Sequence, residues 1–516
     1  MKSRSVRRAA KRSHAESLAV NFARSAVWLG LSCSQAVAQD AVVSRAYQFV
    51  PTFNASAQLI DVRSRNGASQ PAELVMQLGP GLQLSKQSGR IQGTLDYQLL
   101  GNIHSRQSDR NTVDNNLAAS GRAEAVPGWM YVDARANLGK QSVSPLGQQT
   151  AADSLASNGN QQEVLNLQVS PYVRGELRDL ADYELRLKAG ATEVRGTSVG
   201  DSYTVGSSLS LSSPRRGALL GWGLSATQDR VDFKGGRATD NYRVTASISA
   251  TPYTDLTVVA RAGQESTNVG ALESRSYDNW GGGLRWTPSP LTVVSLSGDR
   301  RYFGDSYQVA LEHRLRRSTF RFTSTRDATS SGDAYGVGQP LTLLQLYMRQ
   351  YQSVEPDVGL RFIRVLELLR QSGQNPNTVV GGGFATSAVT LQRRDDLSYT
   401  YIAPRSTITV RANSGTTEIL DNVSSQRGIG FIKQRGLDAS VAHRLTPITS
   451  VTLSGTLQRN SGQNQPDSDL KSVSLNLTTA MNRNTTASVG ARYGVYSGAS
   501  NSNRETSLTG SLSMRF

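Results

Sequence analysis

Val473-Ser474-Leu475-Asn476-Leu477-Thr478 alternates apolar with small polar residues at every position. The same period of two recurs through residues 451–458 and 203–211. This period is typical of a β-strand that has one apolar and one polar face. From Tyr47 onward such segments follow one another, each roughly 10–16 residues long, which is the length that a tilted membrane strand needs.

The connections between these segments favour a membrane barrel over a soluble β-sandwich, which would also alternate. Long connections rich in Asn, Asp, Gly and Ser are predicted at 230–238, 266–275, 419–428 and 461–467. Short turns are predicted at 213–216, 251–252, 287–289, 316–318, 403–405, 446–447 and 482–484. Short turns at one end and longer loops at the other are typical of outer-membrane barrels, whose short turns face the periplasm.

The predicted fold is all-β, a transmembrane antiparallel up-and-down β-barrel of about 22 strands, within a range of roughly 16–24. An even number fits two periplasmic termini. A helical membrane protein is excluded, because no run of ~18 apolar residues occurs. The predicted strands are 48–62, 72–85, 90–104, 114–126, 129–138, 162–173, 181–191, 203–212, 217–229, 239–251, 254–265, 276–286, 290–301, 306–315, 318–327, 388–402, 405–418, 429–445, 448–460, 468–482, 485–497 and 503–516.

Residues 1–38 are predicted to be a signal peptide. Basic residues precede a short apolar stretch at 26–31, and Ala36-Val37-Ala38 supplies a small-x-small cleavage site. Cleavage would leave residues 39–516 as the barrel, with 49 basic and 39 acidic residues and no cysteine, since Cys33 is the only one. The mature chain would then lack disulfides and thiolate chemistry. Its Arg residues are scattered rather than clustered, which argues against nucleic acid as a partner.

One segment, residues 333–379, interrupts the strand pattern. Apolar residues follow a helical spacing between 341 and 348 and again between 360 and 369. Glu355-Pro356-Asp357 between them indicates that one helix ends and another begins. Strand parity places this helical insertion in the longest loop, on the extracellular side. It could cap the barrel, fold into the lumen as a plug, or extend into solvent.

Charged residues are predicted to line the lumen wherever they alternate with lipid-facing Leu and Val. A basic side chain facing lipid at mid-membrane costs ~2–4 kcal/mol, so these residues should face inward. They could form a salt-bridged lining or a surface that selects an anionic solute. The candidates are Glu184, Arg186, Lys188, Arg261, Asp299, Arg301, Glu312, Arg314 and Arg321.

Catalytic chemistry has no support in the sequence. The four histidines include His14 in the predicted signal peptide, and His313 and His443 fall on the apolar face near strand ends. No Ser/His/Asp order, metal-ligand spacing or pair of catalytic carboxylates can be assembled. We therefore predict that the chain is not an enzyme and needs no cofactor or metal.

The last strand places Leu508, Gly510, Leu512, Met514 and Phe516 on one face. This end resembles the C-terminal signature that the barrel-assembly machinery recognises, which makes Phe516 the candidate assembly signal. The resemblance implies that the partners include this machinery and outer-membrane lipids, and that the protein resides in the outer membrane of a Gram-negative bacterium.

Several passages resemble the outer-membrane β-barrel family associated with the PEP-CTERM/exosortase system. They include Pro80-Gly81, Asp96-Tyr97 and Ser170-Pro171-Tyr172, and the most specific are 286–290, 300–307 and 313–314. The resemblance spans about 50–516 and implies an export-associated conduit for exopolysaccharide, with export components as further partners. A structural or adhesive barrel with a plugged lumen remains the alternative.

Overall fold

The computed structural model describes residues 47–516 apart from short gaps. The gaps are 65–70, 87–88, 152–153, 157–158, 197–199, 215–218, 330–340, 352–357, 372–378, 381–387, 421–429, 464 and 499–501. The predicted signal peptide at 1–38 lies outside the described residues, as do parts of the predicted insertion at 333–379. Cleavage after Ala38 therefore stays a prediction.

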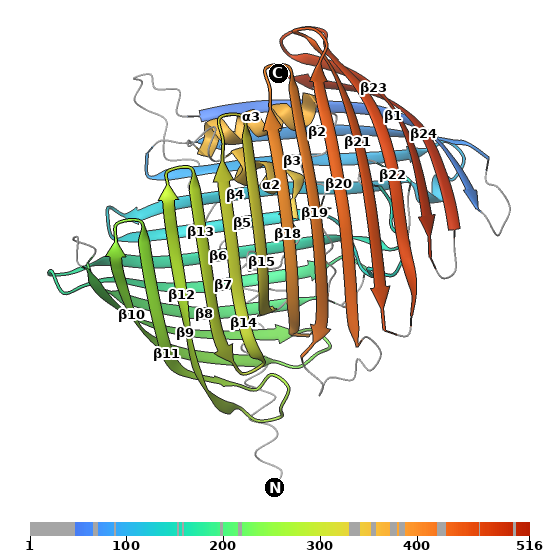
Figure 1. Cartoon of the computed structure of the whole chain (residues 1–516). Helices are drawn as coiled ribbons and strands as arrows, with labels where there is room; N and C mark the ends of the chain where they lie inside the picture. The colour runs from blue at the N-terminus through green and yellow to red at the C-terminus, as the bar shows by residue number, and fades with distance from the viewer. Residues whose placement is uncertain are drawn as a thin grey trace. The chain divides into compact units, whose positions relative to one another are not determined.

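The predicted barrel is confirmed, with 22 antiparallel strands in one sheet (Figure 1). Each strand pairs with its neighbours in the chain, and β1 closes the sheet by pairing with β24. The first eleven strands are β1 (Tyr47–Ser64), β2 (Glu73–Lys86), β3 (Ile91–His104), β4 (Thr112–Val126), β5 (Met130–Ser142), β6 (Gln161–Leu177), β7 (Ala181–Val194), β8 (Ser202–Ser212), β9 (Leu220–Phe233), β10 (Thr239–Tyr253) and β11 (Leu256–Thr267). The others are β12 (Arg275–Ser289), β13 (Thr292–Arg301), β14 (Gly304–Arg314), β15 (Ser318–Thr329), β18 (Thr390–Ile402), β19 (Ser406–Ile419), β20 (Phe431–Arg444), β21 (Thr449–Gly462), β22 (Gln465–Ala480), β23 (Thr485–Ser497) and β24 (Ser502–Arg515).

Between β15 and β18 the chain forms the helical insertion. It contains α2 (Leu343–Gln350) and α3 (Val358–Gln371), so the prediction of helical structure here is confirmed. Two short strands, β16 (Leu341–Thr342) and β17 (Val379–Val380), pair antiparallel on either side of the helices. A single 3₁₀ turn, η2 (Ser108–Arg110), lies between β3 and β4.

The two ends of the barrel differ as predicted. We call one the turn end, because it carries the short connections such as 127–129, 254–255 and 403–405. Phe516 also lies at this end, where its amide donates to the Pro51 carbonyl at 3.0 Å. The opposite end, the loop end, carries connections such as 143–160 and 330–389. The predicted long loop at 461–467 is wrong. β21 ends at Gly462 and β22 begins at Gln465, so only two residues separate the strands.

The outer face of the strands is apolar and open. Val473, Leu475 and Leu477 are 47%, 50% and 46% exposed, and comparable Leu, Val, Ile and Trp side chains recur on most other strands. A water-soluble protein would bury such rows, whereas a bilayer solvates them, and a closed ladder leaves no unpaired strand edge in the lipid. The protein is an outer-membrane β-barrel of a Gram-negative bacterium. Among the described residues, no helix is both long and apolar enough to cross a bilayer.

Candidate functional site in the barrel interior

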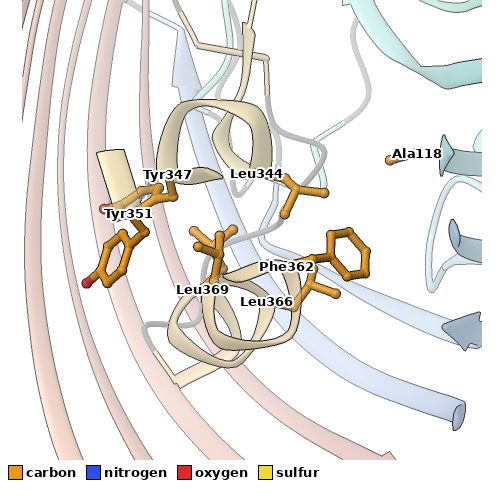
Figure 2. Packing of buried hydrophobic residues seen from close by; sticks show 8 residues of the cluster. Ala118, Leu344, Tyr347, Tyr351, Phe362, Leu366 and Leu369 are labelled. Atoms are coloured by element: carbon orange, nitrogen blue, oxygen red, sulfur yellow. The ribbon is translucent and has the colours of Figure 1, made fainter. Parts of the chain in front are cut away.

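The helices α2 and α3 share a small apolar core (Figure 2). Val365 and Leu369 of α3 are fully buried and pack with Leu344 and Tyr347 of α2. The predicted apolar face of α3 needs one correction, because Leu360 is 55% exposed. The face that packs against α2 starts instead at Phe362.

This pair of helices lies inside the barrel (Figures 1 and 2). On one side, the Tyr347 phenol lies against Thr409 of β19 and Ser440 of β20. On the other side, α3 packs against β3, and Ala118 of β4 belongs to the same apolar cluster. Since β4 and β20 belong to well-separated parts of the wall, the pair crosses the lumen. Of the three predicted positions, the structure shows the one in the lumen.

Two tyrosines anchor α2 at the turn end of the β18–β20 wall. Tyr347 lies within α2, and Tyr351 comes directly after its last residue. Their ring centroids are 6.3 Å apart, and both side chains are buried. Burial raises the pKa of both phenols, that of Tyr351 to about 12, and the Tyr347 phenol also hydrogen-bonds Ser440 and Thr409. Ile402, the last residue of β18, packs against the same cluster, which shows that the insertion reaches the turn end of this wall.

The connection between β5 and β6 (143–160, described apart from 152–153 and 157–158) also enters the lumen, which the sequence analysis did not foresee. We call it the crossing loop. Asn460 of β21 donates to the Pro145 carbonyl at 2.6 Å, and Ser154 donates to Glu505 of β24 at 2.8 Å. The Leu155 amide donates to Gln58 of β1 at 2.9 Å. The loop thus leaves β5 and is held against β1, β24 and β21, which lie beyond β4, β3 and β2 in the wall.

A cavity of about 580 Å³ remains between the crossing loop, the α2–α3 pair and the wall. One continuous stretch of the wall lines it, from β19 through β24 and β1 to β5, together with helix residues such as Leu346 and Tyr347. Most wall positions carry hydroxyl or amide groups. Examples are Thr52, Asn54, Ser56, Gln77, Gln98, Gln434, Thr456, Gln458, Ser474, Asn476, Ser488 and Ser511.

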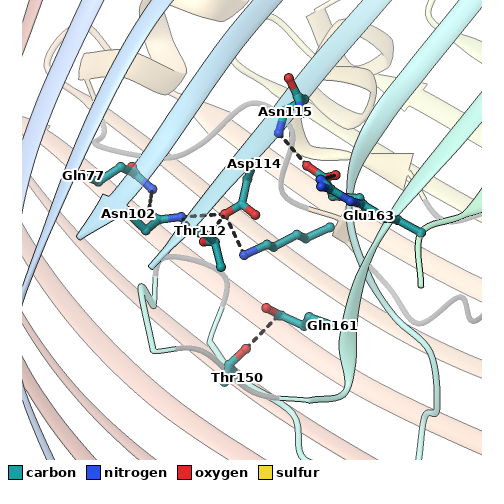
Figure 3. A network of polar contacts seen from close by, with 10 residues as sticks. Gln77, Asn102, Thr112, Asp114, Asn115, Thr150, Gln161 and Glu163 are labelled. Atoms are coloured by element: carbon teal, nitrogen blue, oxygen red, sulfur yellow. Dashed lines mark hydrogen bonds and ion pairs between the residues drawn. The ribbon is translucent and has the colours of Figure 1, made fainter. Parts of the chain in front are cut away.

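The loop-end side of this cavity holds a connected polar network (Figure 3). Gln77 donates to Asn102 at 2.8 Å, and Asn102 donates to Asp114 at 2.5 Å. Asp114 also forms an ion pair with Lys140 at 2.7 Å. Each side chain is therefore held in place by its neighbours, which fixes the position of the donors and acceptors that face the cavity.

The strand register extends this inward face around the whole barrel, because directly opposite residues share one face of a sheet. Arg411 of β19 lines the cavity and stands opposite Ser398 of β18. Ser398 stands opposite Arg321 of β15, which in turn stands opposite Glu312 of β14. Continued in the same way, the register places all nine predicted residues on the inward face: Glu184, Arg186, Lys188, Arg261, Asp299, Arg301, Glu312, Arg314 and Arg321.

Most of these charges are paired within the wall. Arg261 bonds Asp299 at 2.8 Å, and Arg314 bonds Glu312 at 2.5 Å. Arg186 bonds Glu184 at 3.0 Å and Asp133 at 3.1 Å. Lys188 also makes a polar or electrostatic contact. Arg301 is the most enclosed of them, with Glu265 at 2.5 Å and Asp327 at 2.6 Å.

The interior therefore has two chemically different sectors. Charged side chains dominate the inward face of β7–β18, the charged sector. Hydroxyl and amide groups dominate that of β20–β24 and β1–β3, the hydroxyl and amide sector, where the inward charges include Asp96, Asp438, Arg492, Glu505 and Arg515. The inward faces of β1, β21 and β22 carry no charged residue within their described strands. Sequence reasoning missed the partner acids Asp133, Glu265 and Asp327. Their alternation with lipid-facing residues could have indicated that these acids face inward. Which Arg each of them pairs with depends on the strand register.

Asp96 of β3 is the most unfavourably placed group in the interior. Its carboxylate is fully buried, and neither oxygen has a hydrogen-bond partner among the described residues. Asp96 stands opposite Ala118, which contacts the helix pair, and Gln83 and Arg515 lie nearby. A buried carboxylate without hydrogen bonds is costly, so Asp96 destabilises this part of the closed barrel.

Asp96→Asn should therefore stabilise the closed barrel, because it removes the buried charge and keeps the side-chain shape. We expect the free energy of unfolding in detergent to rise by at least ~1 kcal/mol. Asp109→Asn, at an exposed site in η2, should leave it unchanged. The effect should also disappear when residues 333–379 are deleted, because Asp96 is then exposed to water. A loss of stability in Asp96→Asn would contradict this account.

Among the described residues, no group of three or more His, Cys, Asp and Glu side chains is arranged to hold a metal ion. His313 and His443 bond the hydroxyls of Thr292 and Ser406 at 2.8 Å, near the turn end. These contacts join neighbouring strands and account for both imidazoles as structural groups.

The sequence matches no protein-family model and no curated protein. Among solved structures, the FrpB iron transporter from Neisseria meningitidis is similar, with a TM-score of 0.45 and 10% identity over 90% of this chain and 82% of its own. The ferric enterobactin receptor PfeA from Pseudomonas aeruginosa has a TM-score of 0.40 at 10% identity, covering 90% and 80%. OccK2 (OpdF) from the same organism has a TM-score of 0.33 at 10% identity, covering 91% and 98%. No residue role is transferred at this identity.

Proposed function

We propose that this barrel is a conduit for exopolysaccharide that the α2–α3 pair and the crossing loop hold closed. The observation that supports it best is the hydroxyl and amide sector beside the cavity. Alternating hydroxyl, amide and small side chains can exchange hydrogen bonds with sugar hydroxyls along an extended chain. The resemblance of residues 286–307 to the barrel family of the PEP-CTERM/exosortase system supports the same substrate and makes export components the expected partners.

The charges of the other sector fit a structural lining better than a selectivity surface. An Arg that already bonds a carboxylate presents little free positive charge to a solute. Arg261, Arg301 and Arg314 are all engaged in this way. We therefore favour a neutral polysaccharide over an anionic one.

The alternative is a structural or adhesive barrel without transport. It is supported by the two inserted segments, which fill much of the interior that a conduit would need. The two proposals differ in what happens after the insertion is removed, since a structural barrel has no reason to bind sugars in its lumen.

The test is block of ion current by oligosaccharides in planar bilayers, using protein that lacks residues 333–379. A linear neutral oligosaccharide should give resolved blocking events, and an anionic uronic-acid oligomer should give fewer. Gln77→Leu with Gln98→Leu and Gln434→Leu should shorten the events, whereas Arg261→Met with Asp299→Leu should not. A current that neither sugar blocks would argue for an ion-conducting channel, and no current would favour the structural barrel.

A further inference from the structure

The outer face of β20–β22 carries an unusual group of cations at the loop-end border of the apolar belt. We call it the basic patch, and its members are Lys433, Arg435, Arg459 and Lys471. Directly toward the turn end the same face becomes apolar, with Leu437 42% and Leu457 49% exposed. The patch therefore lies where lipid chains give way to headgroups.

The register brings these cations together. Arg435 stands directly opposite Arg459, a position in which the Cβ atoms of two strands are about 4.5–5.5 Å apart. Lys471 stands opposite Leu457 and is thus the diagonal neighbour of Arg459, at about 7–8 Å. Like charges directly opposite each other destabilise a sheet. The arrangement gains from an anion bound between them.

Within the patch, Arg459 is the one member that pairs with acids among the described residues. Arg459 bonds Asp467 at 2.6 Å and lies 3.7 Å from Asp469. Lys433, Arg435 and Lys471 have no ion pair or side-chain hydrogen bond with any residue that the structure describes. Several outward arginines elsewhere on the loop-end rim pair with acids, as Arg300 does with Asp305 at 2.8 Å and Arg230 with Asp232 at 3.3 Å.

We propose that the basic patch binds the phosphate groups of lipopolysaccharide in the outer leaflet. The short turns of a bacterial barrel face the periplasm, so its loop end lies at the outer leaflet. There the anionic lipid is lipopolysaccharide, whose lipid A phosphates lie at the border of the acyl chains. Arg matches phosphate oxygens with two parallel hydrogen bonds, and Lys adds point charges around them. The proposal is independent of what the lumen carries.

The test measures binding of bisphosphorylated lipid A to the purified full chain in detergent micelles. Replacing Lys433, Arg435 and Lys471 by Gln should weaken the affinity by about tenfold or more. The matched control replaces Arg316, Arg405 and Arg483 at the turn end, which removes the same charge from exposed positions. It should bind as the unaltered protein does. If the triple variant fails to assemble, as judged by heat-modifiable gel mobility, Arg435→Gln alone is measured and should weaken binding in the same direction.

Three outcomes would overturn the proposal. One is equal affinity for bisphosphorylated and fully dephosphorylated lipid A, since acyl chains alone would then account for binding. Another is equal affinity in the patch variant and the unaltered protein. The third is displacement of lipid A by millimolar inorganic phosphate, which would indicate a site for free anions instead of a lipid site.

Discussion

Deletion of residues 333–379 should open the barrel and produce a large rise in single-channel conductance. A 22-stranded barrel is too wide for its wall side chains to fill, so inserted segments decide whether it conducts. The α2–α3 pair spans from the β18–β20 wall to the β3–β4 wall and has its own apolar core. The measurement is conductance in planar bilayers, together with the sensitivity of cells to large antibiotics that do not cross an intact outer membrane.

Two point variants separate loss of the helix pair from general damage to the barrel. Leu369→Asp places a charge in the buried core of the pair and should raise conductance part of the way. Leu360→Asp changes an exposed position of the same helix and should leave conductance unchanged. If the deletion variant assembles but conducts no better than the intact protein, the crossing loop closes the barrel and the insertion does not.

Arg301→Met should destabilise the barrel more than any other single substitution in the charged sector. Glu265 is fully buried, and Arg301 is its ion-pair partner at 2.5 Å. Removing one partner of a buried pair leaves an uncompensated charge and costs about 3–5 kcal/mol. Unfolding in urea, followed by tryptophan fluorescence or heat-modifiable gel mobility, should show a loss of this size.

The adjacent residue provides the control. Arg300 faces outward and pairs with Asp305, and both side chains are more than half exposed, so Arg300→Met should cost less than ~1 kcal/mol. Adding Glu265→Leu to Arg301→Met should recover most of the lost stability, because the buried carboxylate is then gone. Equal effects of the two Arg substitutions would show that the Arg301 pair is solvated.

The strands could be predicted because each of them meets lipid on one side and a polar interior on the other. That contrast forces a period of two on the sequence, as in Val473 to Thr478, and the period persists for as long as the strand crosses the bilayer. The predicted long loop at 461–467 was wrong because this contrast between lipid and lumen ends where the strand leaves the bilayer. Outside the bilayer, polar residues on both faces can continue a strand as easily as a loop.

The contacts inside the barrel could not be predicted from the alternation of apolar and polar residues. The sequence marked Arg301 as inward, but its partners Glu265 and Asp327 lie on β11 and β15, and register decides which side chains meet. The helical spacing of 360–369 indicated a helix that packs on something, without indicating whether it lay above the barrel or within it. Nothing in the polar composition of the crossing loop distinguished it from a surface loop.

By itself, the sequence indicated an even strand number near 22, the inward or outward side of the alternating residues and the presence of a helical insertion. These follow from local periodicity and from the demand that lipid makes on every strand. Only the tertiary structure decided what fills the lumen. The contacts that hold the two insertions join residues far apart in the chain, such as Pro145 with Asn460 and Ser154 with Glu505, and they form only once the barrel has closed.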